Sequence, residues 1–290
     1  MKFRAHDTFA IRKGWLHKGI KNVIDNPRVF VDKNINKMDL LGIGANMVKA
    51  LRYWLQVTGL TIEGRGNNRS QTLSDFGQIV WDNDPYFEEY GTLFLLHYFL
   101  VSSQDMATSW YYFFNEYESS EITKENFCFN LNNYVIEKSD QTVSDRAKED
   151  DFDCIIKTYC KSNNNVDPES NIECPLTDLG LIRKEDKLYV KQMPKEDILH
   201  PIIVLSVMVN EFEKSNNDID EIKISTLENA KYNIGKVFNL DNLSIANYLD
   251  KLQALGYLKV VRTAGLDYVK FTNNLTFESC VEKYYATINE

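Results

Sequence analysis

Residues 42–75 constrain the fold most, because several punctuated elements follow one another within a short stretch. Two glycines in residues 42–44 predict a tight turn, and the run over residues 45–58 predicts a helix that a following glycine ends. A short apolar strand over residues 60–62 and a basic loop over residues 64–69 come next. Helix, glycine turn, helix, strand and loop is the order of a winged helix-turn-helix.

The helix predicted over residues 45–58 has two faces, since residues three and four apart lie on the same side. Its inward face consists of apolar side chains, namely Met47, Val48, Leu51, Trp54 and Leu55. Its outward face consists of polar and cationic side chains, namely Asn46, Lys49, Arg52, Tyr53 and Gln56. Cations bind phosphates and amides read base edges, so the outward face fits a DNA groove. An ordinary solvated surface helix has the same pattern, and this alternative stays open.

Charge is distributed unevenly along the chain, whose formal net charge is −9. Residues 1–70 contain thirteen Lys and Arg against five Asp and Glu, which gives +8. The remaining 20 basic and 37 acidic residues give −17. A basic end on an acidic body favours an anionic partner at that end, because the acidic body repels DNA elsewhere.

We therefore expect double-stranded DNA to be a partner of the N-terminal end. The side chains expected to hold phosphates are Lys49, Arg52, Arg65 and Arg69. The side chains expected at base edges are Asn46 and Gln56, with Tyr53 beside them. Arg4, Arg12 and Lys13 extend the expected footprint along the N-terminal segment.

The whole chain predicts a mainly α protein with small β-hairpins, of the α+β class. We expect a winged helix-turn-helix over residues 1–75, a helical bundle over 76–160, a linker and connecting helix over 161–221, and a winged-helix-like domain over 222–290. Within the bundle, Asp84-Pro85 predicts the start of a helix that runs to Val101.

The second winged-helix-like segment has a weaker case for DNA. The outward face of its candidate recognition helix holds Asn247, Asp250, Lys251 and Gln253, and is therefore nearly neutral. Phosphate binding needs cations, so protein contact is at least as well supported there.

Several other function classes lack their motifs. The chain has no apolar run of about eighteen residues and no signal peptide, so we expect a cytoplasmic protein without a membrane partner. It has neither a phosphate-binding P-loop nor a nucleophile elbow, and its five cysteines are predicted to be free thiols. The candidate metal ligands, which we expect to remain structural, are His6, Asp7, Asp84, His97, Cys154, Cys160 and Cys174. We expect no enzyme activity, cofactor or metal.

Ordered stretches across nearly the whole chain carry a family resemblance. They are FRAHDTFAIRKGWLHKG at 3–19, LGIGANMVKALRYWL at 41–55, NDPYFEEYGTLFLLHY at 83–98, PLTDLGLI at 175–182, GKVFNL at 235–240 and RTAGLDYV at 262–269. With them the chain resembles the bacterial family of unknown function numbered four thousand and seven. The resemblance implies a setting in anti-phage defence, beside DNA-phosphorothioation clusters with a cysteine desulfurase and a phosphoadenosine-phosphosulfate-reductase-like enzyme. It implies no catalytic residue.

Two functions of different class remain open at this point. The first is a DNA-binding accessory protein that uses the basic winged helix. The second is an adaptor subunit that scaffolds a partner enzyme of the same cluster, such as a sulfur-transfer or restriction enzyme, without reading DNA. A nuclease or modification enzyme is a third and weaker alternative, which a metal-dependent cleavage assay with a His6 variant would separate from the other two. Two winged-helix units in one chain can replace a dimer, although a symmetric homodimer also remains possible.

Overall fold

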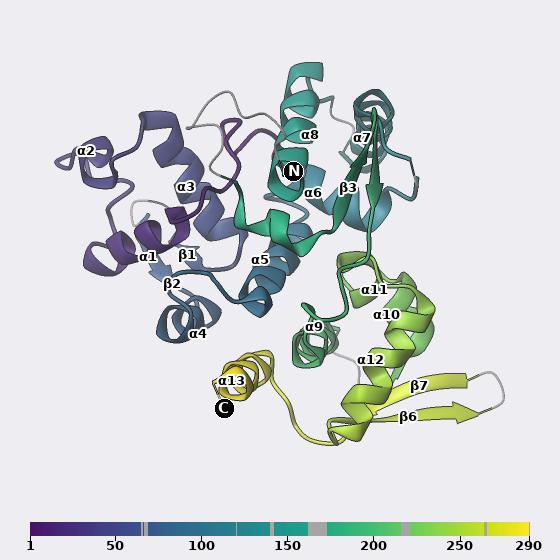
Figure 1. Cartoon of the computed structure of the whole chain (residues 1–290). Coiled ribbons are helices and arrows are strands. Elements are labelled where there is room, and N and C mark those ends of the chain that lie inside the picture. Colours follow the sequence, from purple (N-terminus) through teal and green to yellow (C-terminus); the bar gives the residue numbers. More distant parts are fainter. Residues whose placement is uncertain are drawn as a thin grey trace. The chain divides into compact units, whose positions relative to one another are not determined.

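The computed structural model divides into two compact units, Met1–Gln192 and Met193–Glu290 (Figure 1). It describes residues 1–64, 66, 69–119, 121–139, 142–161, 173–215, 221–263 and 266–289. Helices predominate and the sheets are small and antiparallel, so the expected mixed α+β class is confirmed. None of the helices in these ranges combines the length and the apolar character that a membrane crossing needs.

The first unit opens with the elements expected around the glycine turn. They are α1 (Trp15–Asp25), α2 (Lys37–Leu41), α3 (Ala45–Val57), β1 (Thr61–Glu63) and β2 (Gln71–Leu73). The two strands form an antiparallel hairpin in which Thr61 pairs with Leu73 and Glu63 pairs with Gln71. Gly42 and Gly59 have φ values of 61° and 76°, which glycine adopts without steric cost, so the turn and the end of α3 fall where the sequence predicts them.

The helical part of the first unit follows the hairpin. It comprises α4 (Asp75–Asn83), α5 (Tyr90–Ser102), α6 (Thr108–Tyr111), a π-helical turn (Tyr112–Glu116), α7 (Lys124–Ser139), α8 (Asp145–Tyr159) and a 3₁₀ turn (Pro175–Leu179), and ends in the hairpin β3 (Ile182–Glu185) and β4 (Leu188–Lys191). Aromatic side chains fill its core, and Trp54, Tyr98, Trp110 and Phe113 are almost completely buried. α5 is buried nearly all round, as its apolar composition predicts.

The predicted helix start at Asp84-Pro85 is wrong, because α5 begins only at Tyr90. The Asp84 carboxylate is buried and accepts hydrogen bonds from the backbone N–H groups of Glu88 and Glu89, at 2.9 and 3.1 Å. It also accepts one from the Thr92 hydroxyl at 2.7 Å. These bonds close residues 84–89 into a loop ahead of the helix, and Glu88 and Glu89 lie in that loop.

The second unit combines helices with a three-stranded sheet. Its elements are α9 (Pro201–Lys214), β5 (Glu221–Lys223), α10 (Ile224–Asn229), α11 (Ile234–Val237), α12 (Asn242–Ala254), β6 (Leu258–Thr263), β7 (Leu266–Phe271) and α13 (Phe277–Ile288). The strand order is β5-β7-β6 and all neighbours are antiparallel. The expected turn between β6 and β7 includes residues 264–265, which lie outside the described ranges.

The helix expected to connect domains, α9, lies within the second unit and packs against α12 and α13. Eight consecutive residues of α9, Ile202–Val209, are buried, so this helix forms the centre of that unit. The short strand β5 was not expected, because its sequence Glu-Ile-Lys has the composition of a loop. The predicted segments 1–75 and 76–160 both fall inside the first unit.

Gly77 allows α4 to pack closely against the backbone of Leu60, the residue before β1. A Cβ atom added there would lie 2.0 Å from the carbonyl oxygen of Leu60, a backbone atom that cannot turn away. We expect Gly77→Ala to lower the free energy of unfolding by about 3 kcal/mol or more, because overpacking against backbone forces the elements apart. Gly44→Ala is the control, since its Cβ would meet no atom within 4 Å, and we expect it to cost less than about 1 kcal/mol. Equal urea midpoints for the two variants would contradict this account.

Candidate nucleic-acid interface

The N-terminal half of α3 presents an exposed polar surface. Asn46 and Lys49 are both exposed, and the Lys49 ammonium donates a hydrogen bond to the Asn46 side-chain oxygen at 3.2 Å. Within the described residues, no carboxylate pairs with Lys49. Gly42 and Gly44 before the helix are exposed as well. A cation and an amide are thus available side by side to an anionic partner.

The C-terminal half of α3 is chemically different, because Glu63 of β1 neutralises its cation. The Arg52 guanidinium donates two hydrogen bonds to the Glu63 carboxylate, from Nε at 2.8 Å and from Nη2 at 2.6 Å. The Gln56 amide donates a third at 2.9 Å. The Arg52 side chain is 25% exposed and that of Glu63 18%, so solvent screens the pair only in part. This pair fixes the β1–β2 hairpin against α3.

Tyr53 does not lie on the outward face, and this part of the prediction is wrong. Its side chain is buried, and its hydroxyl donates a hydrogen bond to the backbone oxygen of Met106 at 3.1 Å. Desolvation raises the pKa of the Tyr53 hydroxyl well above its ordinary value, and the nearby Asp151 and Cys154 act in the same direction. The reason for the error is that α3 packs on more than one side, so its buried surface is wider than one apolar stripe.

The remaining predicted contacts have different environments. Arg69 is exposed next to β2, whereas Arg65 lies outside the described residues. Arg4 pairs with Asp150 of α8 at 2.7 Å, and the Arg12 guanidinium lies 5.5 Å from the centre of the Trp15 ring. The described structure therefore brings Asn46 and Lys49 together, while the arginines of the N-terminal segment have partners of their own.

A buried carboxylate anchors the N-terminal arm before α1, and no motif or spacing in the sequence singles it out. Asp151 of α8 accepts a hydrogen bond from His6 Nε2 at 2.8 Å, from the Ser109 hydroxyl at 2.5 Å, and from the Arg4 backbone N–H at 2.7 Å. The other His6 nitrogen accepts the Thr8 backbone N–H at 3.0 Å, which places the ring proton on Nε2. Both ring nitrogens are thus engaged, and His6 serves to hold the arm.

The arm also holds an unusual backbone. Arg4, Asp7 and Thr8 all have positive φ values, of 55°, 47° and 69°. Each such non-glycine residue costs on the order of 1 kcal/mol or more, and the surrounding contacts must offset that cost. The buried Asp151 cluster supplies these contacts, and the Trp54 indole adds a hydrogen bond to the Phe9 carbonyl at 2.9 Å.

No three His, Cys, Asp or Glu residues of the described ranges are arranged to hold an ion. His97 is buried, with Nδ1 at 2.7 Å from the Tyr159 hydroxyl. Burial raises the pKa of the Cys160 thiol to about 11 and that of the Cys174 thiol to about 12, so both cysteines are thiols at neutral pH.

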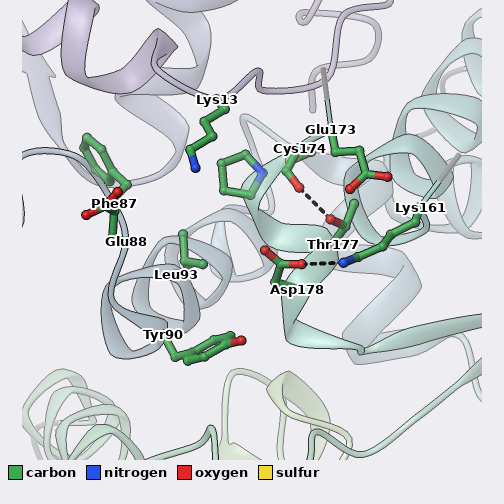
Figure 2. A pocket seen from close by; sticks show the side chains of 11 residues that line it. Lys13, Phe87, Glu88, Tyr90, Leu93, Lys161, Glu173, Cys174, Thr177 and Asp178 are labelled. Atoms are coloured by element: carbon green, nitrogen blue, oxygen red, sulfur yellow. Dashed lines mark hydrogen bonds and ion pairs between the residues drawn. The ribbon is translucent and has the colours of Figure 1, made fainter. Parts of the chain in front are cut away.

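A cavity of about 540 Å³ lies beside the loop that Asp84 closes (Figure 2). Figure 2 shows Lys13 reaching into it from one side, and the Lys161–Asp178 ion pair, at 2.8 Å, on the other. Glu88 and Glu173 also line the cavity, so its three carboxylates outnumber its two ammonium groups. This excess of carboxylates makes the cavity unsuited to a phosphate.

The pair between α3 and the hairpin makes a testable contribution to stability. We expect Arg52→Ala to lower the free energy of unfolding by about 1–3 kcal/mol, because it leaves a half-buried carboxylate without its charged donor. The double variant Arg52→Ala/Glu63→Ala should be less destabilised than the sum of the single variants, with a coupling of about 1–2 kcal/mol in chemical denaturation. Lys138→Ala, which breaks an exposed pair with Glu137, is the control. An Arg52 effect no larger than this control would contradict the assignment.

The raised thiol pKa values predict a pH dependence of alkylation. Burial, together with Glu149, raises the pKa of Cys128 to about 11 from an ordinary value of 9.0. The thiolate is the reactive form, so labelling of Cys128 by iodoacetamide should rise about tenfold per pH unit between pH 8 and 10. Unfolding in urea should accelerate the reaction at pH 8. A rate that is already at its maximum at pH 8 in the folded protein would contradict the raised pKa.

Comparisons with known proteins place the chain in a family. No curated protein matches it, but two solved structures do, both 26% identical over 99% of this chain and 87% of theirs. One is described as a magnesium ion-bound SspB crystal structure, with a TM-score of 0.87, and the other as an SspB crystal structure, with a TM-score of 0.85. The model of a family described as a protein of unknown function, DUF4007, matches residues 3–285. The resemblance found in the sequence is thereby confirmed, and the chain belongs to the DUF4007 family.

Proposed function

We propose that the protein is a DNA-binding accessory protein of a prokaryotic anti-phage defence system of the DNA-phosphorothioation type. In this proposal α1–α3 and the β1–β2 hairpin act as a winged helix-turn-helix, and α3 lies against duplex DNA. The defence setting comes from the family resemblance alone. The protein acts without catalysis or a cofactor, as a cytoplasmic component of the system.

The observation that carries the proposal is the exposed pair Asn46 and Lys49 at the start of α3. In helix-turn-helix proteins the N-terminal residues of the second helix approach base edges, and α3 follows the glycine turn in that position. Asn46 is suited to an adenine edge and Lys49 to a phosphate or a guanine. Arg69, exposed next to β2, is the cation of the wing.

Arg52 and Gln56 take a different role in this interface. Both donate to Glu63, so they orient the hairpin relative to α3 and are positioning residues. A hairpin held at a fixed angle to α3 keeps its cation, Arg69, in a fixed position relative to the helix. Less conformational entropy is then lost on binding. Tyr53 is buried and is left out of the interface.

A second function, that of an adaptor for a partner enzyme, is favoured by the surface of α12 in the other unit. There we propose a winged-helix-like arrangement, formed by α10, α11, α12, β6 and β7, that contacts protein. Leu243 and Leu255 at the two ends of α12 are 70% and 57% exposed. The Lys251 ammonium on this helix is paired with Glu196 at 2.6 Å. An apolar surface with neutralised cations suits a protein partner better than a phosphate backbone.

The test of DNA binding is a salt titration with a labelled duplex. Each neutralised phosphate contributes a slope of about −0.9 in log affinity against log salt concentration. We expect Lys49→Ala/Arg69→Ala to weaken duplex binding about tenfold or more and to make the slope shallower by about 2. The control, Lys138→Ala/Lys187→Ala, removes the same charge elsewhere in the first unit and should bind like the wild type.

Equal affinity and equal slope for the two double variants would remove the DNA-binding proposal. Retention of a partner enzyme by the Lys49/Arg69 variant, with its loss in a Leu243→Asp variant, would favour the adaptor. Since one similar structure is described as magnesium-bound, the titration is repeated with Mg²⁺ on supercoiled DNA. Nicking or cleavage by the wild type would show that the protein is an enzyme and overturn the non-catalytic role.

A further inference from the structure

Three aromatic rings, one each from α1, α4 and the loop before α5, form a stack on the first unit. The ring of His17 in α1 lies between those of Trp81 in α4 and Tyr86 in the loop before α5. Its centre is 5.3 Å from the Trp81 ring at 28°, and 4.6 Å from the Tyr86 ring at 15°. Tyr86 is the outermost member and is 63% exposed, whereas Trp81 and His17 are half-buried. The stack therefore ends in a large ring that is open to solvent.

Polar contacts at His17 and in the loop that carries Tyr86 fix the stack in place. His17 Nδ1 lies 2.9 Å from the Pro85 carbonyl oxygen, which can only accept, so the ring proton sits on Nδ1 and points to the loop. On the other side of Tyr86 the loop is held by the Asp84 carboxylate and its bonds to Glu88 and Glu89. A ring supported in this way loses little conformational freedom when a planar ligand stacks on it.

We propose that this aromatic stack binds an unpaired nucleobase of single-stranded or locally opened nucleic acid, which extends the stack over Tyr86. Base–aromatic stacking is the recurring way in which proteins hold unpaired bases, and it tolerates any base. Lys21 is one helical turn beyond His17 on α1 and is exposed, so it is placed to meet the adjoining phosphate. Among the described residues, no carboxylate forms an ion pair with Lys21.

The charged residues around the aromatic stack determine which interaction provides most of the affinity. Asp82 and Glu88, in the two segments that carry Trp81 and Tyr86, are both exposed and oppose the attraction of Lys21 for phosphates. Stacking must therefore provide most of the affinity at this site. Stacking between uncharged rings is not screened by salt, whereas contacts between cations and phosphates are. The contribution of Tyr86 should thus persist at salt concentrations that abolish duplex binding through Lys49.

The experiment uses the full chain and a fluorescein-labelled twelve-nucleotide oligo(dT), measured by anisotropy at low and high salt. We expect Tyr86→Ala to weaken binding about 5- to 150-fold, by the same factor at both salt concentrations. Tyr86→Phe keeps the ring and should bind like the wild type. Phe129→Ala removes a ring that is 67% exposed on α7 and should have no effect. Thermal unfolding of each variant verifies that the fold is retained.

Two outcomes would overturn the inference. Wild type that does not bind oligo(dT), or Tyr86→Ala that binds it as the wild type does, would show that the stack is not a base platform. If Tyr86→Ala lost no more affinity for oligo(dT) than Phe129→Ala, the conclusion would be the same. The Lys49→Ala/Arg69→Ala variant distinguishes this site from the proposed duplex interface. If duplex binding is absent but oligo(dT) binding still depends on Tyr86, only the duplex proposal fails.

Discussion

The candidate interface depends on the ion pair between α3 and the hairpin that follows it. Glu63 holds Arg52 with two hydrogen bonds and Gln56 with a third, so one carboxylate sets the angle between helix and strand. The same pair divides α3 electrostatically. Its second half is neutral and its first half keeps an available lysine. Any partner that recognises charge is thereby directed to the start of the helix.

Local features of the fold were predictable from the sequence, whereas long-range ones were not. The glycine turn, α3 and the first hairpin follow from residues within a few positions of one another, and they occur as expected. Tyr53 was wrongly assigned to the outward face of α3. Its burial depends on packing against a second neighbour, which the spacing of apolar residues along the helix does not reveal. The Asp84-Pro85 error has a similar cause, since the carboxylate that suits a helix start closes a loop when Thr92 is within reach.

In the candidate site, too, local features were predictable from the sequence and long-range ones were not. Residue type and spacing identified Asn46 and Lys49, which are neighbours on one helix. They also selected Arg52, whose carboxylate partner, Glu63, lies on the next strand. The availability of the Arg52 charge to a phosphate was therefore overestimated. The aromatic stack joins α1 to a loop almost 70 positions later in the chain, with His17 and Pro85 separated by 68 residues. Rings so far apart in sequence carry no common pattern, and only the folded chain brings them into register.

The anchoring of the N-terminal arm has a consequence for biosynthesis. His6 and Asp151 are separated by 145 residues, so the arm cannot reach its partner until most of the first unit has been translated. The left-handed residues at positions 4, 7 and 8 have no reason to adopt their final backbone before then. Docking of the arm is therefore a late event in folding, and it completes the unit that carries the proposed DNA interface.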